Sequence, residues 1–134
     1  MTPTSANDVS LTLKILKANN CQFAVKSGGH ASFAGASNIG GGVAIDLKGL
    51  NEITVSNDRT QTSVGAGQVW SSVYMELDSQ NLSVIGGRSG AIGVGGLTLG
   101  GGISFFSGRY GWACDNVNNY EVRSFKSLFY VSII

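Results

Sequence analysis

Glycine is the feature that most constrains what this chain can fold into. Twenty of the 134 residues are glycine, whereas proline occurs once, as Pro3. The glycine share is about twice the roughly 7% found in average proteins. Glycine without proline is not a linker composition. It indicates a backbone that must turn with positive φ or come very close to another group.

The remaining composition predicts a globular domain, or part of one, that can bury a core. Hydrophobic residues make up 43% of the chain, charged residues only 13%, and the net charge is +1. A nucleic-acid or anionic-membrane partner is therefore not expected. The N-terminus shows no signal peptide, and no apolar run approaches the roughly 20 residues of a membrane span. Cys21 and Cys114 are best interpreted as two buried thiols, although a disulfide between them stays open.

Hydrophobic periodicity predicts an α+β domain rather than a regularly alternating α/β sheet. A helix is expected over residues 5–19, with Ser5 as N-cap and Asp8 completing a capping box. The stripe of Trp70, Val73, Tyr74 and Leu77 predicts a second helix whose apolar face is core. Short strands are expected over residues 21–25, 40–47, 51–55, 60–64 and 81–87.

The glycine clusters invite a nucleotide-binding interpretation, but two familiar fingerprints fail. In a G-x-G-x-x-G pattern starting at Gly93 or Gly65, the last position is Thr98 or Trp70, and no P-loop Gly-Lys-Ser/Thr occurs. The turns at 27–30 and 93–96 each follow an apolar segment and could offer several backbone N–H groups to a diphosphate. Tight structural turns remain the alternative for both.

His30, the only histidine, lies directly after Gly28-Gly29 in "VKSGGHASFAG". A single histidine, no G-x-S-x-G elbow and no second histidine for a typical zinc site argue against hydrolytic or metal chemistry. Asp46 is interpreted as structural, and a solvated surface is expected for the other carboxylates considered: Glu52, Asp58, Glu76 and Asp78. The imidazole beside a possible phosphate site is a candidate nucleophile.

Several segments together carry a family resemblance. The segments are "FAVKSGGHASFAG", "GGVAIDLKGLNEI", "VGAGQVWSSVY" and "VIGGRSGAIGVGGLTLGGGISFFSGRYGWACDNV". They occur in this order, and the match covers nearly all of residues 3–123. They resemble the PCMH-type FAD-binding domain of the vanillyl-alcohol-oxidase superfamily, and within it the fungal berberine-bridge-enzyme-like oxidoreductases. The resemblance implies an N-terminal subdomain with a small sheet and flanking helices, followed by the glycine-rich start of a second subdomain.

The resemblance also implies roles for individual residues. His30 would be bonded through a ring nitrogen to the 8α-methyl group of the flavin. The cofactor-contacting set that it implies consists of Ser27, Gly28, Gly29, His30, Ala31, Ser89, Gly90, Gly93, Gly95, Gly96, Asn116 and Val117. Some relatives attach the flavin a second time through a cysteine. Ser89 occupies that place here, so attachment through His30 alone is expected.

The resemblance implies an FAD-binding domain over residues 1–123 that is incomplete at its C-terminal end, and residues 124–134 are expected to form a divergent apolar tail. Relatives continue for several hundred residues, so the chain is expected to be a truncated FAD-dependent oxidoreductase that lacks the catalytic base. The family reaction implied is oxidation of an alcohol, sugar or alkaloid-like substrate with O₂ as acceptor. The alternatives are an inactive FAD-binding module and a glycine-rich structural domain without cofactor. Family members are often secreted.

Overall fold

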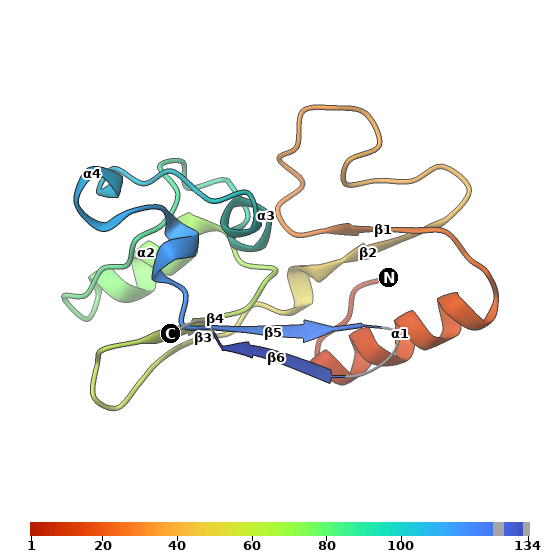
Figure 1. Cartoon of the computed structure of the whole chain (residues 1–134), viewed down its shortest axis with the longest axis horizontal. Coiled ribbons are helices and arrows are strands. Elements are labelled where there is room, and N and C mark those ends of the chain that lie inside the picture. Colours follow the sequence, from red (N-terminus) through yellow and green to blue (C-terminus); the bar gives the residue numbers. More distant parts are fainter. Residues whose placement is uncertain (125–127, 133–134) are drawn as a thin grey trace.

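The computed structural model describes residues 1–124 and 128–132, in which helices and short two-stranded sheets are joined by long loops (Figure 1). The helices are α1 (Ala6–Ala18), α2 (Trp70–Asp78), α3 (Val94–Leu99) and α4 (Ser107–Tyr110), with 3₁₀ turns η1 (Leu47–Gly49) and η2 (Ala113–Asn116). The strands are β1 (Phe23–Lys26), β2 (Val43–Asp46), β3 (Ile53–Val55), β4 (Thr62–Val64), β5 (Asn119–Arg123) and β6 (Leu128–Ser132). The predicted α+β class is confirmed.

Helix α1 begins where its capping box predicts. The Ser5 hydroxyl accepts a hydrogen bond from the Asp8 backbone N–H at 3.1 Å, and the Asp8 carboxylate accepts from the Ser5 N–H at 3.0 Å. These bonds satisfy amides that the first helical turn otherwise leaves without partners. The buried face of α1 presents Leu13 and Leu16, which pack with Ile45 of β2 in the first core cluster.

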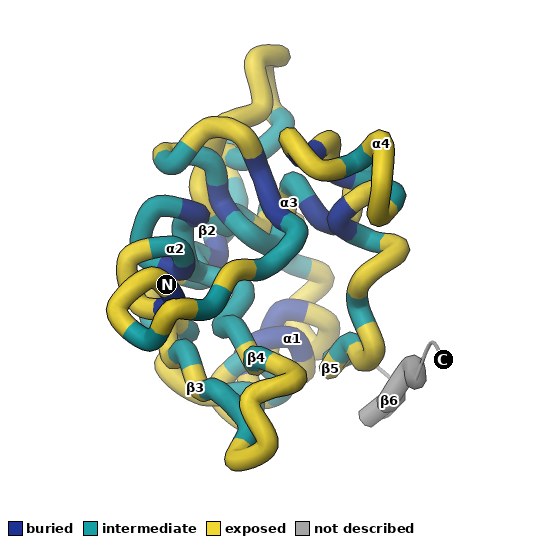
Figure 2. The backbone as a smooth tube through the Cα atoms, turned by 90° about the vertical axis from the view of Figure 1, so that its left-hand side faces the viewer, coloured by how far each residue is buried: buried dark blue, intermediate teal, exposed yellow. Residues whose placement is uncertain are grey.

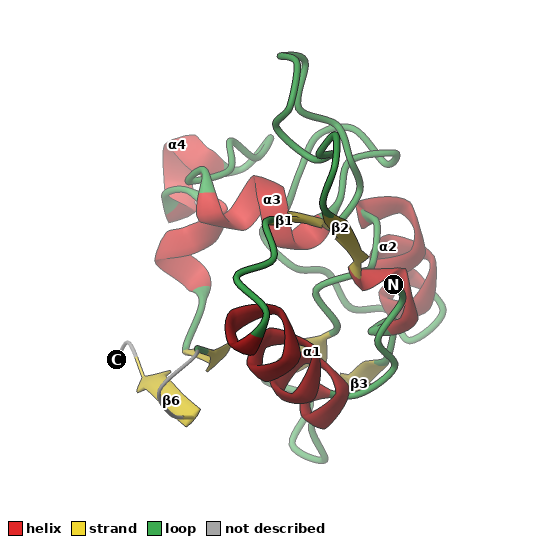
Figure 3. Cartoon of the chain, turned by 90° about the vertical axis from the view of Figure 1, so that its right-hand side faces the viewer, coloured by secondary structure: helices red, strands yellow, loops and turns green. Residues whose placement is uncertain are grey.

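Strands β1 and β2 are parallel, and the connection between them carries the Gly-Gly-His turn. The register places Lys26 opposite Asp46 at the ends of the two strands. The intervening residues 27–42 stand out from the rest of the chain (Figure 3) and are largely exposed (Figure 2). The connection is therefore a surface loop fixed at both ends by the same strand pair.

A second core cluster surrounds α2. Trp70, Val73 and Leu77 are buried, and residues of the antiparallel β3–β4 hairpin and of α3 pack against them. The predicted core stripe of α2 is thus confirmed. Helices α2, α3 and α4 gather at the end of the molecule away from α1 (Figure 1).

The strand expected over residues 81–87 is wrong, because this segment has no regular structure. Its end packs on α2 instead of pairing with a strand. The Tyr74 hydroxyl donates to the Gly87 carbonyl at 2.7 Å, and Gly86 and Gly87 lie directly against the Trp70 indole. Apolar residues and glycine produced a strand-like pattern, but the contact that they make is with a helix.

The tail predicted over residues 124–134 falls partly outside the described residues, namely at 125–127 and 133–134. Leu128–Ser132 forms β6, which pairs antiparallel with β5. Cys21 and Cys114 are both free thiols, and each is partly rather than fully buried. Within residues 1–124 and 128–132, no helix has the length and apolar character of a membrane span. The same residues contain no cluster of three or more His, Cys, Asp or Glu able to hold a metal ion.

Hydrogen bonds lower the pKa of three aspartates below the ordinary value for aspartate. The largest causes are the Thr4 backbone N–H for Asp8, the Lys26 ammonium for Asp46 and the Ser56 hydroxyl for Asp58. In each case the hydrogen bond favours the ionised form of the carboxyl group. Each of these carboxylates therefore binds protons less readily in the folded chain than in the unfolded chain.

Acid is therefore expected to destabilise the fold. A carboxylate whose pKa is depressed on folding stabilises the chain fully above the unfolded value of about 3.9. That contribution is lost as the pH falls through the folded pKa. The free energy of unfolding in urea should be lower at about pH 3 than at about pH 6, and Asp58→Asn should show a smaller decrease. Equal free energies at the two pH values would contradict the expectation.

Candidate functional site

The two glycine turns predicted to cooperate are in direct contact. A Cβ built on Gly28 would lie 2.7 Å from Gly93 Cα, and a Cβ built on Gly93 would lie 2.7 Å from Gly28 Cα. Real Cβ atoms do not approach other heavy atoms this closely, so both positions require glycine. The chain thus brings the loop after β1 onto the start of α3 without any side chain between them.

The first loop has an unusual run of free backbone donors. From Gly28 to Gly35, no backbone N–H donates a hydrogen bond to another described residue. The backbone N–H groups of Gly95 and Gly96 also have no acceptor in the described part of the chain. A Cβ on Gly96 would meet nothing within 4 Å, so the space beside it is open. Exposed amides next to open space can bind phosphate oxygens.

A third turn supports both loops and was not identified from the sequence as part of the site. The Ser27 hydroxyl donates to the Ala66 carbonyl at 2.6 Å. A Cβ on Gly95 would lie 3.0 Å from the same carbonyl oxygen. The signal available was Gly65-x-Gly67, which fails the G-x-G-x-x-G pattern and was not assigned to the site. Ser27 therefore has a structural hydrogen bond in addition to its predicted role.

His30 and Ala31 lie on the exposed part of the β1–β2 connection. The His30 imidazole makes no hydrogen bond or ion pair with any described residue. Two residues before it, Gly28 contacts Gly93, so the imidazole is close in sequence to the junction of the loops. An imidazole without a partner in the fold is available to react with a bound molecule.

Of the remaining predicted site residues, Ser89 and Gly90 belong to the loop that leads to Gly93, whereas Asn116 and Val117 lie at η2. Gly90 accepts a hydrogen bond from the Ser71 N–H at the start of α2, and Ser89 is exposed beside it. Asn116 belongs to η2, where its side-chain amide donates to backbone carbonyls of the α4–η2 turn. Val117 caps the same turn. Asn116 thus has an evident structural function, and no described hydrogen bond links it to the glycine loops.

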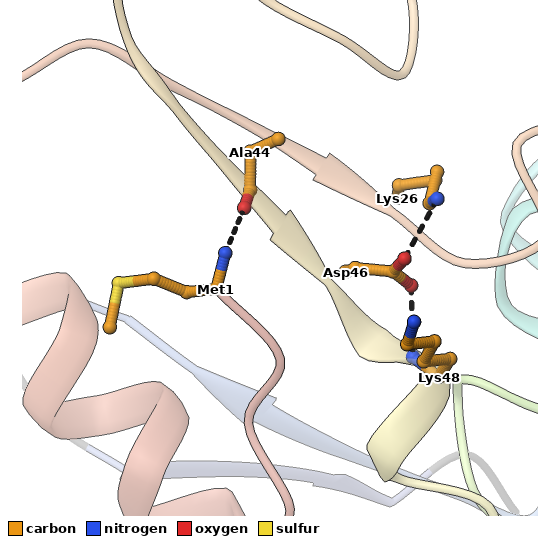
Figure 4. Close-up of polar contacts among 5 residues, drawn as sticks. All are labelled: Met1, Lys26, Ala44, Asp46 and Lys48. Carbon is orange, nitrogen blue, oxygen red and sulfur yellow. Dashed lines mark hydrogen bonds and ion pairs between the residues drawn. The ribbon is translucent and has the colours of Figure 1, made fainter.

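Opposite charges meet just before the Gly-Gly-His turn (Figure 4). The Lys26 ammonium lies 2.8 Å from an Asp46 carboxylate oxygen, and the other oxygen accepts from the Lys48 backbone N–H at 3.2 Å. The β2 strand also bonds to Met1, whose ammonium donates to the Ala44 carbonyl. Asp46 is half-buried and has a partner on each oxygen, so its predicted structural role is confirmed.

These features fit the diphosphate group of a dinucleotide. Glycine backbones in contact, unpartnered amides and open space beside Gly96 provide hydrogen bonds without Lys or Arg. A small α+β domain with two such loops belongs to the class of nucleotide-cofactor-binding domains. The chain is a member of the FAD-binding domain family, whose model matches residues 1–124.

The relatives are FAD-dependent oxidoreductases. The FAD-dependent monooxygenase tpcD of Cochliobolus heterostrophus is 48% identical over 118 residues, which are 88% of this chain and 23% of that protein. The 6-hydroxy-D-nicotine oxidase of Arthrobacter nicotinovorans superimposes with a TM-score of 0.89 at 28% identity, over 96% of this chain and 28% of that structure. Glucooligosaccharide oxidase from Acremonium strictum superimposes with a TM-score of 0.85 at 26% identity, over 98% of this chain and 28% of that structure. The chain spans about a quarter of their length.

The family resemblance and the PCMH-type fold inferred from the sequence are thereby confirmed, as is FAD as cofactor. The glucooligosaccharide oxidase is described as carrying a 6-S-cysteinyl, 8α-N1-histidyl FAD. Its flavin is thus attached at two positions. In the present chain the resemblance aligns Ser89 with the second attachment cysteine of some relatives, and Cys114 lies next to Asp115 in η2.

Gly93→Ala is expected to separate the two loops and to weaken FAD binding. Gly93 adopts φ −68° and ψ 138°, which alanine tolerates, so the effect is steric. The added methyl group would lie 2.6 Å from Ser27 Oγ as well as against the Gly28 backbone. We expect a loss of about 2–3 kcal/mol in the free energy of unfolding, measured by urea denaturation, and a parallel loss of FAD affinity.

Gly108→Ala is the matched control, because a methyl group at that position would meet nothing within 4 Å. It should unfold like the parent chain. Equal stability and equal FAD affinity in Gly93→Ala would show that the two loops are not held in contact.

Proposed function

We propose that this chain holds FAD at the junction of its glycine loops and bonds the flavin through His30. The pyrophosphate would accept hydrogen bonds from the backbone of Ser27–Ala31 and of the Ser89–Gly96 loop. Asn116 and Val117 would contribute near the adenosine or pyrophosphate. FAD, once bound, supplies two-electron redox chemistry.

The observation that carries the proposal is the run of unpartnered amides from Gly28 to Gly35, beside the contact with Gly93. Nothing in the described fold uses these donors, and glycine allows a phosphate to approach them closely. The lack of Lys or Arg in the two loops is consistent with binding by amide dipoles rather than by side-chain charge.

Within this proposal His30 is the nucleophile. Its imidazole would hold the flavin by a bond between a ring nitrogen and the 8α-methyl carbon, and the bound FAD would itself supply the two-electron oxidation that this bond requires. Attachment through this one histidine prevents loss of the cofactor.

For a protein of the full length of the relatives, we propose oxidation of an alcohol, sugar or alkaloid-like substrate with O₂ as acceptor. This chain spans about a quarter of that length, and none of its described side chains is assigned as catalytic base. Its own role in the proposal is therefore to hold and to tether FAD.

The test is to express the chain, add FAD, precipitate with acid and measure flavin in pellet and supernatant. Flavin in the pellet supports the covalent bond. If flavin binds to the native chain but is found in the supernatant after acid precipitation, the covalent bond is contradicted and the proposed FAD site stands. A chain that leaves FAD fluorescence unchanged and yields a colourless pellet contradicts both.

A further inference from the structure

The turn that carries His30 packs against the side chain of Lys26, a residue that has no role in the FAD-binding proposal. Gly29 has φ +69°, a left-handed conformation that reverses the chain just before His30. The position that a Cβ would take on Gly29 lies 3.1 Å from Lys26 Cδ and 3.4 Å from Lys26 Cγ. The alkyl part of Lys26 thus packs against the inner side of this turn.

The Lys26 side chain is held in that position from its far end. Its ammonium lies 2.8 Å from the Asp46 carboxylate, directly across the parallel β1–β2 pair. The second Asp46 oxygen is fixed by the Lys48 backbone N–H, so the carboxylate is restrained at both oxygens (Figure 4). Lys26, Asp46, Gly29 and Ala31 also line one hollow of about 550 Å³ beneath the loop.

The loop has few other restraints. No backbone N–H from Gly28 to Gly35 donates a hydrogen bond within the described fold, and the first backbone hydrogen bond after His30 runs from the Ala36 N–H to the Phe33 carbonyl. The Gly28–Gly93 contact fixes one side of the turn. Gly29 lies between Gly28 and His30 in the sequence, and the side chain that contacts it is the alkyl stem of Lys26.

We propose that Lys26, held by Asp46, is a positioning residue that sets the direction of the His30 imidazole. This inference rests on the proposed function for its effect on flavin, but it concerns a contact within the chain itself. A half-exposed ion pair contributes little to overall stability. Its removal should therefore change the loop more than the fold, because small displacements at a reacting group have large effects.

The experiment compares four variants of the full chain. Lys26→Ala removes stem and charge, Asp46→Asn releases the ammonium, and Lys26→Arg keeps a stem and an ion pair. Lys48→Ala is the control, since it removes one positive charge but retains the backbone N–H that binds Asp46. The measurements are the melting temperature, the FAD dissociation constant, the acid-stable flavin fraction and the NMR signal of the single imidazole.

Lys26→Ala is expected to lower the acid-stable flavin fraction and the FAD affinity by about five- to ten-fold, with a smaller loss in Asp46→Asn. Lys26→Arg should restore both, and Lys48→Ala should match the parent. The His30 signal should shift in Lys26→Ala and not in Lys48→Ala, while the melting temperature changes little.

The imidazole signal separates this inference from the proposed function. If the parent chain binds no FAD and Lys26→Ala still shifts the His30 signal, the cofactor proposal fails and the positioning role stands. If Lys26→Ala has the parent's imidazole signal, the positioning role is overturned whatever the flavin result. The same conclusion follows if the parent tethers flavin and Lys26→Ala tethers it equally well.

Discussion

His30→Ala is expected to reduce acid-stable flavin to background while leaving the fold intact. The chain has no second histidine, and by the family resemblance Ser89 replaces the cysteine that attaches the flavin a second time in some relatives. The imidazole is exposed and has no described partner, so its loss should change the free energy of unfolding by less than about 0.5 kcal/mol. The measurement is flavin fluorescence of the denatured protein band, together with the mass of the intact chain.

Two comparisons make the His30→Ala result specific. Ser32→Ala alters an exposed side chain of the same loop and should keep the parent's flavin content. FAD added to His30→Ala should still bind reversibly, because the backbone amides are unchanged. Flavin that remains covalently bound to His30→Ala would move the attachment to another side chain and contradict the proposal.

The fold could be predicted where a local signal and the tertiary contact agree. The Ser5–Asp8 capping box and the Trp70–Leu77 stripe depend on residues close in sequence. Helix α1 forms within one residue of the expected bounds 5–19, and α2 contains the whole predicted stripe. Residues 81–87 could not be predicted in this way, because Gly86 packs on an indole that is distant in sequence. Helix α3 was also missed. It contains Gly95 and Gly96, which are poor helix formers, and tertiary packing holds it.

The candidate site shows the same limit. The loops at 27–30 and 93–96 could be identified from their glycines, because a residue without Cβ indicates that another group approaches the backbone closely. That the two loops touch each other, and that Ala66 accepts the Ser27 hydroxyl, depends on the three-dimensional arrangement. Asp46 was interpreted as structural from its apolar neighbours, but its partner Lys26 became evident only through the parallel register of β1 and β2.

Trp70→Ala is expected to cause the largest loss of stability among the substitutions considered. Trp70 is 4% exposed, belongs to the second core cluster and is stacked on Tyr74. Removing an indole from a packed core lowers the free energy of unfolding by about 3–5 kcal/mol, because the burial of apolar surface is lost and a cavity remains. Urea unfolding measures the loss. Trp70→Phe is the milder companion, since the indole N–H has no described hydrogen-bond partner to lose.

A double-mutant cycle with Gly86 tests whether the indole is the reason for glycine at that position. A Cβ on Gly86 would lie 2.7 Å from Trp70 Cη2 and closer still to the adjacent ring carbons. Gly86→Ala alone should therefore cost about 2 kcal/mol through overpacking. In a chain that already carries Trp70→Ala, the methyl group enters vacated space and its cost should nearly disappear. The two changes would then couple by about 1–2 kcal/mol. Strict additivity would mean that the cost of the methyl group at position 86 does not come from the contact with Trp70.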